Sequence, residues 1–173
     1  MKDNSFALKT KNLEVFSQSF EQTMNLGRSL AQHLLPGDIL AFFGDLGAGK
    51  TCMIQGICQG LGVSKDVYIT SPTFVIMNRY NGRLPIYHFD FYRLSCREEI
   101  IDLGYEEFFF GQGVCMIEWA DRAEGLIPDD YFKVLMKIIS PTDRKVEIIA
   151  YGIDCQKRLS HLNSIYKNTE NIS

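Results

Sequence analysis

The residues Gly44-Asp45-Leu46-Gly47-Ala48-Gly49-Lys50-Thr51 match the pattern G-x-x-x-x-G-K-[ST], in which a glycine-rich loop binds phosphate. Glycine lets backbone N–H groups approach phosphate oxygens closely, and the N-terminus of the following helix favours negative charge. In this pattern the lysine contacts the outer phosphates and the hydroxyl residue binds Mg²⁺. We therefore expect a nucleotide site at residues 44–51 and the adjoining Cys52, with ATP and Mg²⁺ as cofactors.

The segments before this loop fit the architecture that the pattern requires. Residues 38–43 form a short continuous apolar run that is followed by glycine, which is typical of a strand buried on both faces. Further upstream, Ser19 with Gln22 three residues later is a capping-box signal, which predicts a helix that ends at Pro36-Gly37. A rough alternation over residues 13–20 is compatible with a strand before that helix.

The rest of the chain reads as strands and helices of one α/β domain. A helix is expected at residues 51–61, and one or two short helices are expected within residues 95–110. Further strands are expected at residues 73–80, 84–89, 114–118, 131–138 and 145–151. This reading gives a single P-loop ATPase domain at residues 1–155, followed by a C-terminal surface helix or polar tail at residues 156–173.

The composition disfavours several classes of protein. A net charge of −3 and a pI of about 5.6 argue against a protein that grips nucleic acid by its overall charge, so any RNA contact would be local or made through another protein. The five cysteines include no C-x-x-C pair, which favours reduced thiols over a disulfide framework or zinc ribbon. The polar start and the lack of a run of about 20 apolar residues predict a soluble, cytoplasmic protein without a membrane partner.

A phosphate-binding loop of this kind needs a further carboxylate at the end of a neighbouring strand to hold the metal or its water shell. Two strand-end acids qualify: Glu118, which ends the apolar run from Val114, and Asp90, which ends the run from Leu84. A lone strand-end acid is usually a surface residue, but the loop beside it favours the metal-site reading. The guanine-reading N-K-x-D motif and the LSGGQ signature are missing, which disfavours Ras-like GTPases and transport ATPases.

Four ordered motifs resemble one known family. They are GDLGAGKT at residues 44–51, SPTF at 71–74, HFDFYR at 88–93 and IEW at 117–119. They are similar to the motifs of the TsaE (YjeE) family, and the resemblance extends from about Ser19 to Tyr151. It implies a P-loop nucleoside triphosphate hydrolase fold, with a mixed, mostly parallel β-sheet flanked by helices. The family's proline is replaced by Ala120, which affects no expected catalytic residue.

The resemblance also implies a function and its partners. Members of this family are ATPases required for threonylcarbamoylation of the adenosine next to the anticodon in tRNAs. The implied partners are the proteins of a threonylcarbamoyl-transferase complex, with tRNA contacted indirectly or weakly.

The same resemblance assigns roles to individual residues. It places Thr51 and Glu118 at the magnesium site, and Asp90 at the metal's water shell or the attacking water. Ser71 and Thr73 fall in a segment that senses the γ-phosphate, although an ordinary Ser-Pro turn has similar odds from sequence alone.

Together with Lys50, the acids Asp90 and Glu118 are the expected catalytic residues. Trp119 directly follows Glu118, so it is expected at the rim of the nucleotide site, with a place in the core as the alternative.

Two further expectations concern activity and docking. No arginine has a sequence setting that marks it as a built-in finger, so we expect an Mg-dependent ATPase that is weak alone and stimulated by partners. The aromatic stretch at residues 89–110 is expected to form a docking surface, unless it packs as a flank of the core.

A small-molecule or nucleotide kinase of the P-loop class is the alternative function. A kinase would normally carry an arginine-rich lid, whereas the arginines here are scattered. A nucleotide-gated binding module, whose hydrolysis serves only as a clock, also remains open.

Overall fold

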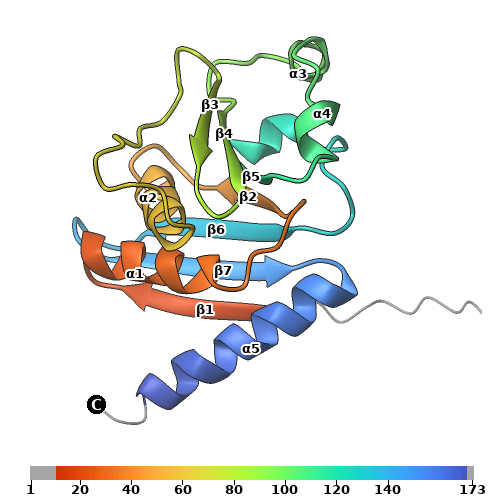
Figure 1. Cartoon of the computed structure of the whole chain (residues 1–173). Coiled ribbons are helices and arrows are strands. Elements are labelled where there is room, and N and C mark those ends of the chain that lie inside the picture. The colour runs from red at the N-terminus through yellow and green to blue at the C-terminus, as the bar shows by residue number, and fades with distance from the viewer. Residues whose placement is uncertain (1–10, 171–173) are drawn as a thin grey trace, which may run out of the picture.

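The phosphate loop follows the central strand of a seven-stranded mixed sheet in a computed structural model that describes residues 11–170 (Figure 1). The strands are β1 (Lys11–Ser17), β2 (Ile39–Phe43), β3 (Met77–Asn81), β4 (Pro85–Asp90), β5 (Val114–Glu118), β6 (Phe132–Ile138) and β7 (Arg144–Ala150). They lie in the order β1-β7-β6-β2-β5-β4-β3. Strand β2 pairs in parallel with β5 and β6, and β4 pairs in parallel with β5, whereas the outer pairs are antiparallel.

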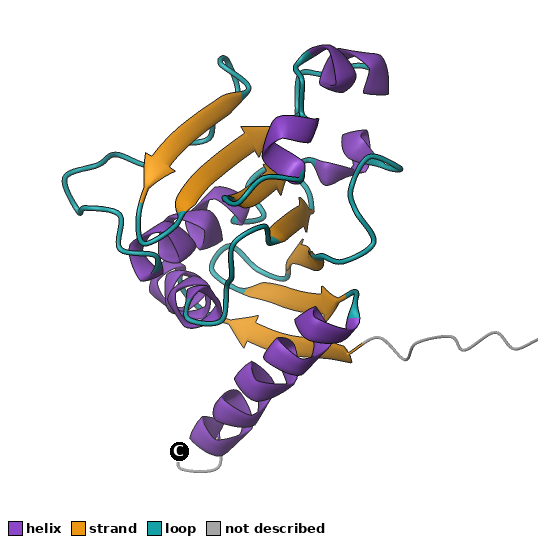
Figure 2. Ribbon diagram, turned by 45° about the vertical axis from the view of Figure 1, so that its right-hand side comes forward, coloured by secondary structure: helices purple, strands orange, loops and turns teal. Residues whose placement is uncertain are grey.

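Helices lie on both faces of the sheet, and the longer helices share one face (Figure 2). They are α1 (Phe20–Ala31), α2 (Lys50–Gly60), α3 (Arg97–Asp102), α4 (Glu106–Phe109), the 3-10 helix η1 (Ala120–Ala123) and α5 (Ile153–Glu170). Helices α1, α2 and α5 share one hydrophobic core with the sheet, and α3, α4 and η1 contribute to a second core. Because β2 and β5 contribute to both cores, their continuous apolar runs are explained by burial on two faces.

The start of α1 confirms the expected cap. The Ser19 hydroxyl accepts a hydrogen bond from the Gln22 backbone N–H at 3.2 Å, and the Gln22 side chain accepts one from the Gln18 N–H at 2.7 Å. The helix therefore begins at Phe20, directly after its N-cap residue.

No helix among residues 11–170 is both long enough and apolar enough to cross a membrane.

Several expected elements have different bounds in the structure. The helix expected to end at Pro36-Gly37 ends at Ala31, and the strand expected within residues 13–20 ends at Ser17. The strand expected at residues 73–80 is limited to β3, because residues 72–76 form a turn in which the N–H groups of Val75 and Ile76 donate to Pro72 O. The helix expected from residue 156 begins at Ile153 instead. Its buried Cys155, Leu159 and Leu162 belong to the core next to β1 and β7, so residue 155 lies inside a packed helix.

The expected aromatic docking surface is largely a packed core flank. Phe89, Phe91, Tyr105 and Phe109 are all buried in the second core, where the Phe89 ring lies 5.6 Å from Phe91 and 5.8 Å from Phe109 between centroids. Among the described aromatic residues of this stretch, Tyr92 and Phe110 are exposed. The short helices α3 and α4 fold these rings back onto the sheet, which the local sequence does not reveal.

Candidate functional site

The phosphate loop connects the end of β2 to the start of α2. Gly44 and Gly49 adopt positive φ angles of 144° and 100°, which side chains disfavour. A Cβ atom at position 44 would also lie only 2.3 Å from the backbone oxygen of Met136 on β6. Glycine at these positions therefore gives the loop its shape and sets it tightly against the neighbouring strand.

Lys50, the first residue of α2, lies inside the loop. Its Nζ donates to the carbonyl oxygens of Gly44 at 2.7 Å and Asp45 at 2.9 Å, and it lies 4.2 Å from the centroid of the Trp119 ring. Burial lowers the pKa of the ammonium group, and the nearby carboxylates of Glu118 and Asp90 partly oppose that shift. Within residues 11–170 Lys50 forms no ion pair with a carboxylate, so its ammonium group is placed to pair with an anion that enters the loop.

The two strand-end acids lie side by side because their strands pair in parallel. Asp90 at the end of β4 is in register with Glu118 at the end of β5. Carboxyl ends of adjacent parallel strands form one edge of the sheet, where ligands bind in open α/β folds. The pairing thus brings both acids beside the phosphate loop.

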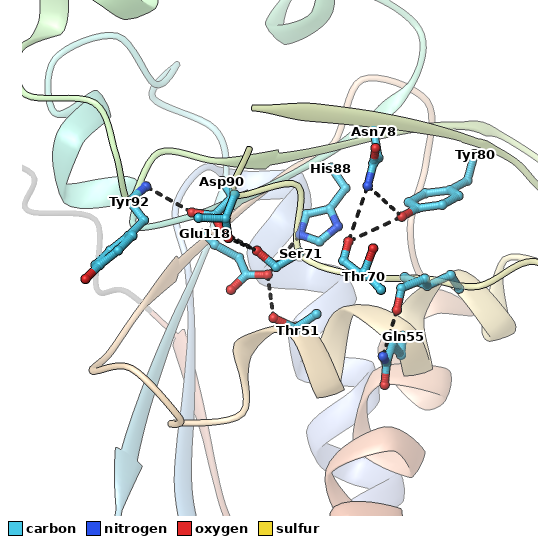
Figure 3. Close-up of polar contacts among 12 residues, drawn as sticks. Thr51, Gln55, Thr70, Ser71, Asn78, Tyr80, His88, Asp90, Tyr92 and Glu118 are labelled. Atoms are coloured by element: carbon cyan, nitrogen blue, oxygen red, sulfur yellow. Dashed lines mark hydrogen bonds and ion pairs between the residues drawn. The ribbon is translucent and has the colours of Figure 1, made fainter. Parts of the chain in front are cut away.

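Glu118 is tied to the loop and to a buried histidine (Figure 3). Its Oε1 accepts a hydrogen bond from Thr51 Oγ1 at 2.7 Å and lies 2.9 Å from His88 Nε2. His88 is fully buried, and its Nδ1 has no hydrogen-bond partner within residues 11–170. An ionised Glu118 only accepts, so Nε2 must carry the proton of the imidazole. His88 therefore contacts Glu118 and helps to position its carboxylate.

Asp90 accepts hydrogen bonds from two hydroxyl groups in the loop before β3. Its Oδ2 accepts from Ser71 Oγ and from Thr73 Oγ1, the latter at 2.8 Å, and its Oδ1 accepts the Tyr92 N–H at 2.9 Å (Figure 3). The Asp90 N–H in turn donates to Ile76 O at 3.0 Å. The segment of residues 71–76 is thus tied to a candidate catalytic acid through both its side chains and its backbone.

The same segment carries a strained residue and is anchored to α2. Ile76 has a φ of 66°, an unfavourable value for a β-branched side chain. Just before the segment, Gln55 on α2 donates to Ile69 O at 2.8 Å, and Tyr80 and Asn78 on β3 reach Thr70 O (Figure 3). A strained loop between anchored ends is the kind of element that can change its arrangement when a ligand binds.

These groups line one cavity of about 360 Å³, a volume within the usual range for ligand sites. Its lining comprises Leu46, Gly47, Gly49, Lys50, Thr51, Cys52, Ser71, Thr73, Asp90, Tyr92, Glu118 and Trp119. The structure therefore brings together most of the residues expected from sequence, including Cys52. Gly44, Asp45 and Ala48 belong to the loop but do not line the cavity.

Tyr92 also lies at the site, where the sequence predicts no role for it. The Tyr92 ring lies 5.0 Å from the Trp119 ring between centroids, so Tyr92 forms a wall of the cavity. Trp119 is expected from the sequence either at the rim of the nucleotide site or in the core. It lines the cavity and also packs against the second core.

The oxygen ligands of the cavity fit Mg²⁺. Magnesium prefers oxygen, keeps several waters, and is usually held by one or two carboxylates together with substrate phosphates. The Thr51 hydroxyl touches the Glu118 carboxylate, and Asp90 lines the same cavity. Within residues 11–170 no group of three or more His, Cys, Asp or Glu residues could hold a metal alone. A divalent cation here would therefore share its coordination with the phosphates of a nucleotide.

Comparison with known proteins gives consistent matches. Residues 17–146 match the family model of "Threonylcarbamoyl adenosine biosynthesis protein TsaE". The tRNA threonylcarbamoyladenosine biosynthesis protein TsaE of Bacillus subtilis is 41% identical over 133 residues, which cover 76% of this chain and 82% of the relative. The protein of the same name from Treponema pallidum is 36% identical over 132 residues, covering 76% of this chain and 96% of the relative.

A solved structure confirms the fold. The crystal structure of Bacillus subtilis YdiB superposes with a TM-score of 0.78 at 33% sequence identity, covering 90% of this chain and 96% of that one. The expected P-loop fold is therefore correct. The relatives give no support for a small-molecule or nucleotide kinase.

Proposed function

Since this chain belongs to the TsaE family, we propose that it is the ATP-binding and hydrolysing component required for threonylcarbamoylation of the adenosine next to the anticodon in tRNAs. The role in tRNA modification is supported by the family match over residues 17–146. The ATPase part is supported by the placement of Glu118 and Asp90 in register beside the phosphate loop, with Glu118 already bonded to Thr51. P-loop nucleotide hydrolysis needs a loop that binds phosphates, a lysine, a hydroxyl group that binds the metal, and carboxylates, and this arrangement supplies all of them.

The cavity residues divide the chemistry among them. Lys50 would exchange its bonds to Gly44 O and Asp45 O for the outer phosphates, which neutralises their charge. Thr51 and Glu118 would hold Mg²⁺, which supplies further charge neutralisation at the phosphates when bound. Asp90 would orient the attacking water and accept its proton, after its hydrogen bonds with Ser71 and Thr73 rearrange.

The release of Ser71 and Thr73 gives the site a way to signal its state. Their hydroxyls are bonded to Asp90 in the structure and would turn to the γ-phosphate or a metal-bound water when ATP binds. Segment 71–76 would then adopt one arrangement with ATP and another after hydrolysis. We propose that a threonylcarbamoyl-transferase complex in the cytoplasm detects this difference, and that tRNA is contacted indirectly or weakly.

Reconstitution tests the function. The protein is combined with the transferase-complex proteins, tRNA, threonylcarbamoyl-adenylate, ATP and Mg²⁺, and the modified adenosine is measured over several turnovers. We expect sustained modification with the wild-type chain and none beyond background with Lys50→Ala. Lys157→Ala is the matched control, because this lysine is exposed on α5 and its ammonium group pairs with Asp154, away from the phosphate cavity. Equal modification without the protein, or with Lys50→Ala, would exclude the proposed role.

A further inference from the structure

His88 lies where the main core meets the phosphate cavity. Side chains alternate along a strand, so Ile86, His88 and Asp90 of β4 share one face of the sheet. Ile86 is fully buried in the main core, whereas Asp90 lines the cavity. His88 lies between them, is fully buried, and is in register with the buried Met116 on β5. An apolar side chain would suit the packing at this position as well.

The His88 ring directs its one hydrogen bond at Glu118. Its Nε2 lies 2.9 Å from Glu118 Oε1 (Figure 3). Its Nδ1 is the one buried side-chain nitrogen or oxygen atom without a partner in the part of the chain that the structure describes. A buried polar atom without a partner is unfavourable, and an apolar side chain would not carry that penalty. The ring is therefore better explained by what it does to Glu118 than by what it adds to the core.

The two carboxylate oxygens of Glu118 have different surroundings. Oε1 accepts from Thr51 Oγ1 at 2.7 Å and from His88, whereas Oε2 forms no hydrogen bond within residues 11–170. Because Oε2 is not among the buried atoms without a partner, it is open to the cavity that Glu118 lines. If Thr51 turns its hydroxyl to Mg²⁺, His88 is the described donor that still holds Oε1. The protein then occupies one oxygen and leaves the other for the ligand.

On the basis of the proposed function, we propose that His88 is a positioning residue that commits Oε1 of Glu118 to the protein and thereby favours Mg²⁺ over a larger divalent cation. Mg²⁺ demands near-ideal octahedral geometry, whereas Ca²⁺ also accepts both oxygens of one carboxylate. A Glu118 with Oε1 held offers a single oxygen, which suits the smaller ion. Removal of a hydrogen-bond partner behind a metal ligand typically lowers metal affinity by roughly 10–100-fold.

Two substitutions of His88 separate this role from packing. Glutamine places its amide nitrogen the same number of bonds from Cα as Nε2, so His88→Gln keeps a donor for Glu118. Asparagine is one bond shorter and places its amide nitrogen where Nδ1 is, so His88→Asn loses that donor. Both variants bury a neutral amide, which makes them matched controls for each other.

Calorimetric titration of the full chain with ATP in EDTA, in Mg²⁺ and in Ca²⁺ measures how much each cation adds to nucleotide affinity. In EDTA we expect both variants to bind ATP within about twofold of wild type, because the phosphate loop is unchanged. The gain from Mg²⁺ should fall about tenfold in His88→Asn and stay within about threefold in His88→Gln. The gain from Ca²⁺ should stay within about threefold in both, so His88→Asn loses the preference for Mg²⁺.

Nitrogen-15 NMR of the wild type without nucleotide tests the hydrogen bond directly. The chain has three histidines, so His33→Gln and His161→Gln identify the other two ring signals. We expect the His88 ring to carry its hydrogen on Nε2. A hydrogen on Nδ1 alone would overturn the proposal, even if neither His88 variant folds.

Other results would also contradict this role. Equal losses in His88→Gln and His88→Asn, or a loss in EDTA as large as that in Mg²⁺, would mean that His88 only packs. An unchanged preference for Mg²⁺ in His88→Asn would reject the selection of the cation. If Mg²⁺ adds nothing to ATP binding by the wild type, the proposed ATPase function fails as well. If it does, and Lys50→Ala abolishes hydrolysis, failure of the His88 variants rejects only this inference.

Discussion

At the scale of single residues, the site is held together by hydrogen bonds that a bound nucleotide would have to replace. Lys50 is bonded to two carbonyls of its own loop, Thr51 to Glu118, and Ser71 to Asp90. Buried polar groups left without partners are unfavourable, so these internal bonds stabilise the site before a ligand arrives. Each of these hydrogen bonds also identifies a residue whose contacts must change when a nucleotide binds. Substitution of such a residue can therefore separate nucleotide binding from turnover.

The lowered pKa of Lys50 predicts a pH dependence of nucleotide binding. Burial disfavours the ammonium form in the empty protein, so its proton is lost at a lower pH than that of an exposed lysine, whose pKa is about 10.4. Bound phosphates favour the charged form, so binding takes up a proton at alkaline pH and weakens as pH rises through the pKa of the empty state. Titration of Mg·ATP from pH 7.5 to 10 measures this decline.

Lys50→Met is the control for that titration. It should bind weakly at every pH and show no decline, because methionine does not ionise. A wild-type affinity that stays constant to pH 10, or the same decline in Lys50→Met, would contradict the role of this ammonium group. The sign for stability is the reverse: the unfolded chain binds this proton more tightly, so stability of the empty protein rises with pH between the two pKa values.

The two acids are expected to affect different kinetic parameters. Glu118 is bonded to Thr51 at the metal side of the cavity, so Glu118→Ala should weaken Mg²⁺-dependent ATP binding. Asp90 lies farther along the sheet edge with the hydroxyls of segment 71–76, so Asp90→Asn should bind ATP within about threefold of wild type and lower turnover on the order of 10²-fold. Affinity by calorimetry and single-turnover hydrolysis measure the two effects. Identical losses of affinity and rate in both variants would reject this division of roles.

At the scale of elements, α5 packs one apolar side against the domain. The sequence after residue 156 predicts a surface helix or tail, and the structure has a helix that exposes Lys157 and His161 and buries Leu159 and Leu162 in the main core. Arg158 forms an ion pair with Asp38 in the turn before β2, and its Nη1 donates to His33 O at 3.0 Å. The helix thereby braces the segment that leads into the central strand.

Leu159→Ala tests this contribution of α5. The side chain is 1% exposed, so its truncation removes apolar contacts and leaves a cavity. We expect the free energy of unfolding to fall by about 2–5 kcal/mol, measured by urea denaturation. The neighbouring Lys157→Ala should change it by less than about 0.5 kcal/mol, because Lys157 is exposed. A Leu159→Ala effect as small as that of Lys157→Ala would mean that α5 does not stabilise the domain.

The elements that could be predicted are those fixed by local patterns. The phosphate loop, the apolar runs of β2 and β5 and the capped start of α1 each carry a pattern whose physical cause is local or a simple burial on both faces. The strand expected at residues 73–80 forms only from Met77, because residues 72–76 form a turn closed by hydrogen bonds to Pro72 O, with Ile76 at a positive φ. The bond between His88 and Glu118 depends on which strands become neighbours, and no local pattern encodes that order.

At the scale of the whole molecule, the distribution of arginines decides how active the protein can be alone. The lining of the phosphate cavity, within residues 11–170, includes Lys50 as its basic side chain and no arginine. Arg93 lies over the Phe74 ring, 5.1 Å from its centroid, and Arg144 is bonded to Gly47 O on the far side of the loop. We therefore expect the isolated chain to lack part of the positive charge that would stabilise the transferring phosphoryl group.

The isolated protein should therefore hydrolyse ATP slowly, with a turnover below about 10⁻² s⁻¹, because P-loop enzymes without an arginine in place gain roughly 10³–10⁵ in rate when one is supplied. Phosphate release at saturating Mg·ATP is measured for the chain alone, with the transferase-complex proteins, and with those proteins plus tRNA. We expect stimulation by the complex for wild type and none for Lys50→Ala. Arg93→Ala should leave the slow basal rate within about twofold, since this guanidinium contacts Phe74 and does not line the cavity. A basal rate near 1 s⁻¹, or a large loss of basal rate in Arg93→Ala, would show that the chain carries its own activating arginine.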